Sequence, residues 1–190
     1  MQNTRRNFIA AGAAFLGTAP FAAQAASPRS KVRLPRKFRP QDVKIKTNLP
    51  VGTIYVNKQD HFLYLITGDG EARRYGVALG AVGRNFEGTA VIARKAEWPS
   101  WIPTRNMIEM EPEVYGPFAS GLPGGHPENP LGARALYMYV NGRDTYYRIH
   151  GTHLPHTIGM KFSSGCIRLT NEHVSELYDM VPVGTKVIVA

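Results

Sequence analysis

A histidine and a cysteine, His150 and Cys166, stand sixteen residues apart in the C-terminal part of the chain. These side chains together can perform nucleophilic thiol catalysis, in which an imidazole removes the thiol proton and the thiolate attacks a carbonyl carbon. Free cysteine has a pKa of roughly 8.5, so a nearby imidazole or cation is needed to populate the thiolate at neutral pH. Arg168 supplies such a cation two residues after the cysteine. Gly165 permits a tight backbone approach with its N–H directed at a developing oxyanion.

Cys166 is the only cysteine of the sequence, so no intramolecular disulfide can form. A buried cysteine that packs as a small hydrophobic side chain is the commoner role, and residue types and spacing leave it open beside the catalytic role. A zinc site built from His150, His153, His156 and Cys166 is a weaker alternative, because such spacings across a proline-containing loop match no recognised zinc framework. Thiol catalysis requires no metal and no organic cofactor, so we expect neither.

Short runs of β-branched and aromatic residues between turn residues predict the strands that position these two side chains. A hairpin turn is predicted at Asn141-Gly142. The predicted strands are 52–57, 61–66, 73–79, 88–95, 135–141, 145–149 and 186–189. His150 therefore follows the end of a strand, in a domain that is mainly β.

The clearest helix begins shortly after Cys166, behind a cap at Thr170 or Asn171, and ends before Pro182. Its apolar residues recur at helical spacing and are Val174, Leu177, Tyr178 and Val181. A cysteine just before this helix and a histidine at a strand end can meet in space.

Residues 98–129 are so rich in proline and glycine that we predict a long loop without ladder pairing. Trp98 and Trp101 are candidates for an aromatic wall over a substrate cleft, with residues 122–132 as its opposite rim. Packing of both tryptophans beneath the loop is the alternative. Tyr137, on the following strand, is a further candidate substrate contact.

The first 25 residues predict an export signal. Arg5 and Arg6 precede an apolar stretch over 8–21 and a small-residue end at 23–25. The paired arginines resemble a twin-arginine signal, which implies export of a folded protein to the periplasm. An ordinary signal with two arginines and a buried N-terminal helix are the alternatives.

Composition predicts one globular domain behind a basic arm. The 190 residues are 43% hydrophobic and 10% aromatic, which excludes a disordered chain. No later apolar run is long enough to predict a stable membrane insertion. The formal charge is +9, and the two arginines of the predicted signal leave +7 after its removal. We predict a basic linker over 26–47, rich in arginine, lysine and proline, and a catalytic domain over 48–190. The charge suits a polyanion such as the cell wall and does not by itself separate this from nucleic acid or anionic lipid.

The segments Ile149-His150-Gly151-Thr152 and Ser163-Ser164-Gly165-Cys166-Ile167-Arg168, with their spacing, resemble the active-site signature of the L,D-transpeptidase catalytic domain family, of YkuD type. The similarity extends from about residue 49 to residue 189. It implies a mainly β fold of the YkuD type, a β-sandwich with one short helix near the C-terminus and a long loop over the cleft.

The resemblance implies a role for each residue of the signature. Cys166 is the nucleophile, His150 the general base, and the backbone carbonyl of Gly151 the group that orients the imidazole. Backbone N–H groups near Gly165 hold the oxyanion. Arg168 fixes the loop or meets a substrate carboxylate, with a structural salt bridge as the alternative.

Two serines complete the implied site. Ser163 and Ser164 shape the turn and offer hydroxyl groups to the substrate. Many relatives carry a histidine where this chain has Ser164, so any role of that second histidine is absent here or is filled differently.

The implied activity is acyl transfer on peptidoglycan stem peptides. Cys166 is acylated at the L-centre of the third stem residue, typically diaminopimelate, and D-alanine is released. An amine then accepts the acyl group, from another stem, an envelope protein or a free D-amino acid. Carbapenems are implied inhibitors and nucleic acid is not an implied partner. A hydrolase of the same bond and a non-catalytic wall-binding module remain the rival interpretations.

Overall fold

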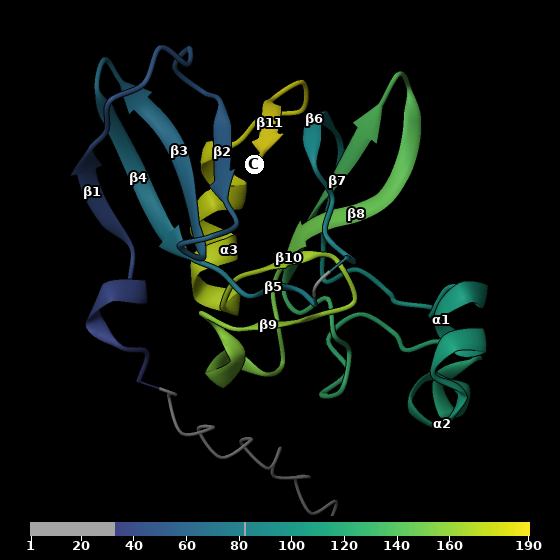
Figure 1. Ribbon diagram of the computed structural model, residues 1–190. Coiled ribbons are helices and arrows are strands. Elements are labelled where there is room, and N and C mark those ends of the chain that lie inside the picture. Colours follow the sequence, from purple (N-terminus) through teal and green to yellow (C-terminus); the bar gives the residue numbers. More distant parts are fainter. Residues whose placement is uncertain (1–32, 82) are drawn as a thin grey trace, which may run out of the picture. The chain divides into compact units, whose positions relative to one another are not determined.

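The computed structural model describes residues 33–81 and 83–190 (Figure 1). The predicted export signal at 1–25 and residues 26–32 of the predicted linker lie outside the described residues. Within the described ranges, no helix combines the length and the hydropathy needed to cross a membrane.

One large mixed sheet dominates the described part of the chain. Nine strands follow the order β1-β4-β3-β2-β11-β6-β7-β8-β10. Their bounds are β1 Gln41–Lys44, β2 Ile54–Asn57, β3 Phe62–Gly68, β4 Glu71–Gly76, β6 Gly88–Glu97, β7 Arg134–Val140, β8 Arg143–His150, β10 Ile167–Arg168 and β11 Lys186–Val189. A second small sheet pairs β5 (Leu79–Gly80) with β9 (Lys161–Ser163) in parallel. The mainly β fold predicted from the sequence is confirmed.

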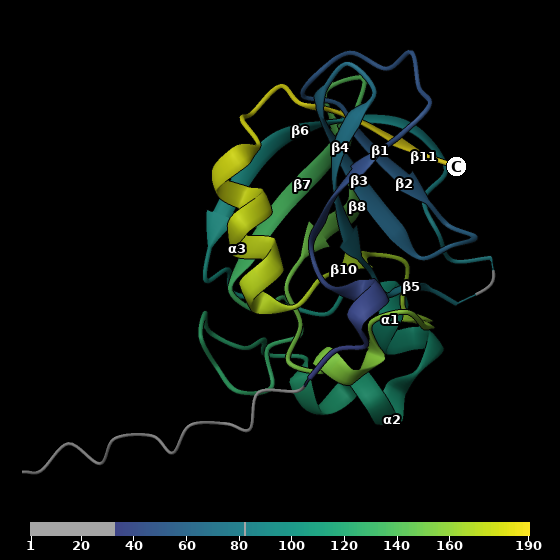
Figure 2. The same cartoon turned by 90° about the vertical axis from the view of Figure 1, so that its left-hand side faces the viewer.

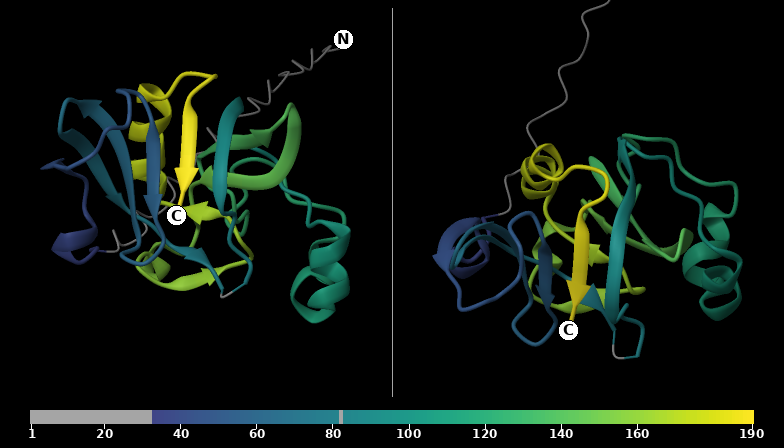
Figure 3. Two further views of the ribbon diagram at one scale, coloured as in Figure 1. Left: turned by 45° about the horizontal axis from the view of Figure 1, so that its top comes forward. Right: turned by 90° about the horizontal axis from the view of Figure 1, so that it is seen from above.

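The C-terminal strand β11 joins two wings of the large sheet. It pairs in parallel with β2 and antiparallel with β6, and so lies between β1–β4 on one side and β6–β8 on the other (Figure 3). Strand alternation buries one face of each wing. The main core lies between these faces and includes Ile54, Leu63, Leu136, Met138 and Ile149.

Helix α3 (Asn171–Met180) closes this core. Its apolar stripe contributes Val174 and Leu177, both fully buried, and the helix packs against β7 (Figure 2). The Thr170 side chain caps it by accepting a hydrogen bond from the backbone N–H of His173 at 3.2 Å. The predicted helix and its cap are confirmed.

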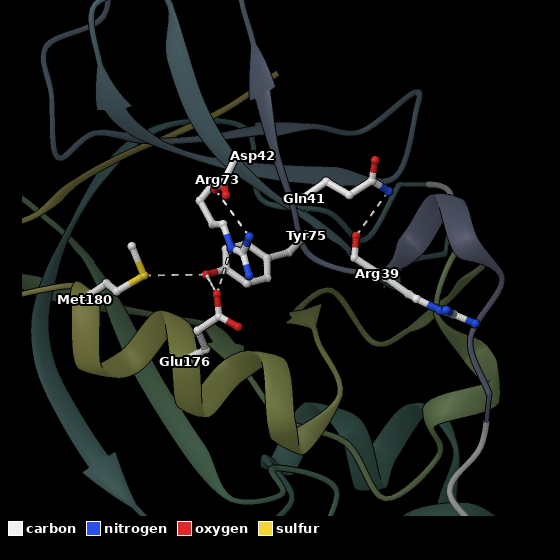
Figure 4. Close-up of polar contacts among 7 residues, drawn as sticks. All are labelled: Arg39, Gln41, Asp42, Arg73, Tyr75, Glu176 and Met180. Carbon is white, nitrogen blue, oxygen red and sulfur yellow. Dashed lines mark hydrogen bonds and ion pairs between the residues drawn. The ribbon is translucent and has the colours of Figure 1, made fainter.

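A polar cluster ties α3 to the other wing of the sheet (Figure 4). Glu176 accepts hydrogen bonds from Arg73 Nε at 2.8 Å and from the Tyr75 hydroxyl at 3.0 Å. Arg73 also pairs with Asp42 of β1 at 3.3 Å. The helix that follows the cysteine is therefore fixed to both wings.

The sequence interpretation was wrong about residues 33–47, which we placed in a linker outside the domain. A short 3-10 helix, η1 (Arg36–Phe38), precedes β1, which pairs antiparallel with β4. Leu34 and Phe38 are buried in a second small core with Ala78 and Ile158. These two apolar residues are separated by basic residues and proline, which hid the packing segment.

The long loop contains two short helices that we did not predict, α1 (Arg105–Met110) and α2 (Pro112–Tyr115), followed by the 3-10 turn η2 (Gly116–Phe118). Thr104 caps α1 by accepting a hydrogen bond from the Met107 N–H at 3.2 Å, and Pro112 occupies the first position of α2. Another 3-10 turn, η3 (Pro155–Thr157), follows the histidine segment.

Candidate active site

Strands β8 and β10 bring the histidine and the cysteine segments together. They pair in parallel, with Ile167 opposite Ile149 and Arg168 opposite His150. Ile149 and Ile167 point into the main core. Because side chains alternate along a strand, His150 and Arg168 face the opposite side of the sheet. Cys166 immediately precedes β10, so this pairing brings its backbone next to the end of β8.

His150 is buried at the end of β8, and its ring is held by its own backbone neighbour. The Nδ1 atom lies 2.6 Å from the carbonyl oxygen of Gly151. A carbonyl oxygen can only accept a hydrogen bond, so this contact places the proton of a neutral imidazole on Nδ1 and the lone pair on Nε2. This geometry matches the orienting role implied for the Gly151 carbonyl.

Burial and the neighbouring Arg168 cation lower the pKa of His150 to about 3, while the carbonyls of Gly151 and Leu131 oppose the shift. At neutral pH the imidazole is therefore unprotonated. A neutral histidine with a free lone pair is the form that can accept a proton.

Cys166 is half-buried, and its sulfur lies 3.9 Å from the carbonyl oxygen of Tyr146. Burial raises the pKa of the thiol, while a hydrogen bond from the Arg148 backbone and the Arg148 and Arg168 cations act in the opposite direction. The thiol is thus protonated at neutral pH. The Arg148 and Arg168 cations stabilise the thiolate electrostatically when it forms.

Arg148 belongs to a row of stacked side chains across three strands. Its guanidinium lies 4.7 Å from the ring centre of Tyr137, and the Arg94 guanidinium lies 3.4 Å from the same ring. Asp144 binds Arg148 at 3.2 Å. Tyr137 is only 4% exposed, so little of its surface is available for the predicted substrate contact, which stays a prediction. Its ring positions Arg148 beside the cysteine.

A bulge in β8 brings the Tyr146 carbonyl to the sulfur. Tyr137 pairs with Arg148 but Tyr139 pairs with Asp144, so residues 145–147 stand opposite a single residue of β7. Tyr146 has a φ of 62°, and its side chain is 69% exposed. Such a bulge redirects backbone groups out of the ladder.

The turn before Cys166 is built by Ser163. Its hydroxyl donates to the Cys166 carbonyl at 2.6 Å and accepts from the Gly165 N–H at 3.1 Å. Gly165 has a φ of 133°, and an added Cβ would overlap the Arg84 carbonyl oxygen, so only glycine fits. Without a bound substrate, the N–H of Gly165 has the Ser163 hydroxyl as its acceptor, and its predicted role toward an oxyanion stays a prediction.

Ser164 has a partner from the long loop. The Ser164 and Tyr115 hydroxyl oxygens are 2.6 Å apart. Trp101 packs on Tyr115 and on Phe118, with ring centres 6.3 and 6.0 Å away. Trp101 therefore packs within the loop, as the alternative to a substrate contact predicted, and supports Tyr115. Trp98 is 53% exposed, which leaves an aromatic surface available. Its backbone N–H donates to the Ala133 carbonyl at 2.8 Å.

Arg168 is largely buried and has no ion pair among the residues that the structure describes. Its Nε atom is buried without a hydrogen-bond partner. Backbone bonds to Ala78 at 2.8 and 2.9 Å hold the segment, and burial lowers the pKa of the guanidinium against the influence of Cys166 and Tyr115. The salt-bridge alternative is not supported, and the cation remains uncompensated beside the cysteine.

Asn171 connects the helix start to the histidine segment. Its Oδ1 accepts the N–H of Ala133 at 3.0 Å, and an added Cβ on Gly151 or Gly132 would overlap this oxygen. Sequence reasoning considered Asn171 only as a cap. Arg148 and Tyr115 were missed as well; Arg148 was accessible from strand periodicity, since it precedes His150 by two residues, whereas nothing in the sequence pointed to Tyr115.

Comparisons with known proteins agree on one family. The family model of the L,D-transpeptidase catalytic domain, YkuD, matches residues 52–189. The probable L,D-transpeptidase YbiS of Escherichia coli K12 is 32% identical over 150 residues, which are 78% of this chain and 47% of YbiS. The chain thus spans about half the length of the curated relatives it matches first.

Solved structures extend the likeness to the fold. One from Brucella melitensis, named a probable carnitine operon oxidoreductase, is 51% identical with a TM-score of 0.56, over 83% of this chain and 96% of that chain. The structure of the LD transpeptidase LdtMt1 in complex with imipenem is 17% identical with a TM-score of 0.50, and the match covers 73% of this chain and 58% of that chain. With the family match covering most of the described domain, this chain belongs to the L,D-transpeptidase catalytic domain family.

Proposed function

We propose that the protein is a periplasmic peptidoglycan L,D-transpeptidase that uses Cys166 as its nucleophile and His150 as its general base. The observation that carries the proposal is the His150 Nδ1 contact with the Gly151 carbonyl, 2.6 Å long, at the end of the strand that pairs with the residues directly after Cys166. It leaves a neutral imidazole with its Nε2 lone pair available. Two cations, Arg148 and Arg168, favour the thiolate electrostatically.

In the first step the Cys166 proton passes to His150 Nε2 as the sulfur attacks the carbonyl carbon of the third stem residue. The C–N bond to D-alanine breaks, and the imidazolium returns the proton to the leaving amine. The product is a thioester on Cys166. Burial disfavours the imidazolium, so the proton is held only briefly.

In the second step an acceptor amine attacks the thioester and loses a proton to His150. The C–S bond breaks, the new amide leaves, and the thiolate recovers the proton. The acceptor is another stem, giving a cross-link between third residues, or an amine of an envelope protein or of a D-amino acid. Water in its place gives the hydrolase reaction.

The structure from Brucella melitensis is named an oxidoreductase, which is a different reaction class from acyl transfer. The present sequence contains no G-x-G-x-x-G fingerprint of a dinucleotide site, and its match over 52–189 is to the transpeptidase model. Acyl transfer is therefore the activity that the residues support best.

Intact-protein mass spectrometry tests the proposal. The protein is mixed with imipenem, the compound bound in the LdtMt1 structure, and separately with a disaccharide tetrapeptide. We expect a covalent adduct with each and release of D-alanine, all lost in Cys166→Ala. Added amine should shift the product mass from hydrolysis to transfer. A folded protein that forms neither adduct would overturn the proposal and favour the wall-binding module.

A further inference from the structure

The net positive charge of the chain is concentrated in one segment. After the predicted export signal, residues 26–47 contain eight lysines and arginines and one acid, whereas residues 48–190 contain thirteen basic and thirteen acidic residues. The formal charge of residues 48–190 is therefore zero, and the +7 of the chain without its signal comes entirely from the segment in front of them. The proposed reaction gives this charge no role.

The structure folds part of this segment into a corner of the domain, around η1. The exposed cations there, which we call the basic corner, are Arg33, Arg36, Lys37 and Arg39. Within the described part of the chain none of them forms an ion pair. The one acid of the segment, Asp42, pairs with Arg73 instead. The corner thus presents four cations within seven residues, without an acidic partner.

Packing holds the basic corner in place. Phe38 is buried against two glycines: a Cβ added to Gly76 would lie 2.6 Å from the Phe38 Cβ, and one added to Gly159 would overlap the Phe38 ring. The Arg39 side chain also closes the turn, because its Nε donates to the Leu34 carbonyl at 3.2 Å. The cations are therefore presented by a fixed turn, which lowers the entropy that binding must cost.

The positive surface of the corner continues onto β9. Burial lowers the pKa of His61, and the Lys161 and Lys37 cations lower it further, against the Val77 carbonyl and the Asp60 carboxylate. Lys37 of the corner and Lys161 of β9 therefore act on the same side chain. Lys161 is exposed as well, so a second segment adds its charge to the same region.

Four cations of this kind suit a polyanion, and the burial of Phe38 indicates which kind. Proteins that bind a single nucleic-acid strand combine a positively charged groove with exposed aromatic rings on which the bases stack. Phe38 is only 9% exposed, and Lys37 Nζ lies 4.7 Å from its ring centre, so the corner offers no ring for stacking. Clusters of four to eight lysines and arginines without this requirement are typical of proteins that bind anionic lipid head groups.

We propose that the basic corner adsorbs the folded protein onto an anionic phospholipid surface, with its guanidinium and ammonium groups on the lipid phosphates. Leu34 and Phe38 are buried in the small core, so the apolar side chains of the corner are not available for insertion between acyl chains. The attachment is therefore electrostatic, and salt reverses it. This role is independent of the chemistry at Cys166.

Vesicle co-sedimentation tests the proposal. The described residues belong to one compact unit that excludes residues 1–31, so the test uses the chain from Ala26, which lacks the predicted signal and its apolar stretch. We expect this chain to bind vesicles made of equal parts of phosphatidylglycerol and phosphatidylethanolamine at low salt. It should stay in solution with phosphatidylcholine alone, and it should be released at about 1 M salt, where the Debye length is about 3 Å. Equal binding to phosphatidylcholine, or binding that survives the salt, would contradict the proposal.

Two matched variants locate the contact. Each cation near an anionic bilayer contributes roughly fivefold to binding, so Arg36→Gln with Lys37→Gln should lower the partition coefficient by about twenty-five-fold. The control, Arg143→Gln with Lys186→Gln, removes the same charge from exposed residues of β8 and β11 and should lower it by less than about threefold. Equal losses in the two variants would show that only net charge matters and would overturn the basic corner as the contact. Near-UV circular dichroism and the rate of carbapenem acylation should be unchanged in both variants.

Purified peptidoglycan sacculi and duplex DNA represent the other polyanions. If Arg36→Gln with Lys37→Gln loses binding to one of these, while its binding to anionic vesicles equals that of the unmutated chain, the corner serves that polymer and the membrane assignment is wrong. Absence of a carbapenem adduct in the unmutated chain would overturn the proposed function and leave the result with vesicles standing.

Discussion

The Tyr115 hydroxyl and the Ser164 hydroxyl lie 2.6 Å apart, which joins the long loop to the turn of the cysteine. Trp101 packs against Tyr115, so aromatic packing inside the loop fixes the hydroxyl group that Ser164 contacts. A serine paired with a tyrosine thus occupies the position two residues before the cysteine. The long loop is therefore linked by a hydrogen bond to the turn that precedes Cys166.

Removing this contact from either side should have the same effect. We expect Tyr115→Phe and Ser164→Ala each to lower the acylation rate by roughly three- to tenfold, the range for a neutral hydrogen bond. The double variant should be no worse than either single one, because both remove one interaction. Stopped-flow acylation by a carbapenem measures this. Additive losses would show that the two hydroxyl groups act separately.

The reactivity of Cys166 should rise at a higher pH than that of an ordinary cysteine. Burial raises the pKa of this thiol, and His150 is neutral, so the resting pair is not an ion pair. Alkylation by iodoacetamide should follow a single titration whose midpoint lies above roughly 8.5, the ordinary value for cysteine. Arg148→Met, which removes an adjacent cation, should move the midpoint higher. A reactivity plateau below pH 7 would indicate a preformed thiolate and contradict this state.

His150 should make the fold sensitive to acid. Its folded pKa of about 3 lies below its ordinary value of 6.5, so the unfolded chain binds the extra proton between these two values. The stability contributed by the neutral imidazole is fully present above pH 6.5 and is lost as the pH falls toward 3, by about 1.4 kcal/mol per pH unit. Burial lowers the pKa of His153 and His173 as well, which adds slope of the same sign.

Comparison with His150→Gln isolates its share of this slope. Urea unfolding is measured at several pH values between 4 and 7 in both proteins. In the variant, the free energy of unfolding should change less steeply with pH, by the slope that corresponds to the uptake of one proton on unfolding. Identical slopes in both proteins would mean that His150 titrates normally in the folded state.

The sequence predicted the ordered strands and the signature residues better than the contacts between distant segments. Long β-branched runs such as 88–95 and the turn Asn141-Gly142 carry strong local signals, and both residues of that turn have a positive φ. Strand β10 has only two residues, one of them charged, and its pairing with β8 depends on tertiary contact. No local pattern can reveal it.

The site followed the same rule. Residue type and spacing made His150 and Cys166 candidates, and the resemblance to the family signature selected them over a structural cysteine. Tyr115 stands 49 residues from Ser164, and its position depends on how Trp101 packs within a proline-rich loop. The burial of Tyr137 could not be predicted, because alternation gives a shared face and does not tell which side chains on that face are covered.

Gly151 should tolerate no side chain while Asn171 occupies its present position. An added Cβ would overlap Asn171 Oδ1 and lie 3.0 Å from the Ala133 backbone nitrogen. We expect Gly151→Ala to lower the free energy of unfolding by about 1–3 kcal/mol, the usual cost of overpacking. It should also reduce acylation, because the backbone shift displaces the carbonyl that orients the His150 ring. Asn171→Ala alone should cost about 1 kcal/mol, since it leaves the Ala133 N–H without an acceptor.

Combining the two substitutions distinguishes steric overlap from a backbone effect. If the Asn171 side chain is the obstacle, the double variant should be less destabilised than the sum of the single variants by about 1 kcal/mol. Thermal or urea unfolding measures stability, and the carbapenem acylation rate reports whether His150 regains its orientation. Strict additivity would place the cost of Gly151→Ala in the backbone and remove Asn171 from the group of residues that position the histidine.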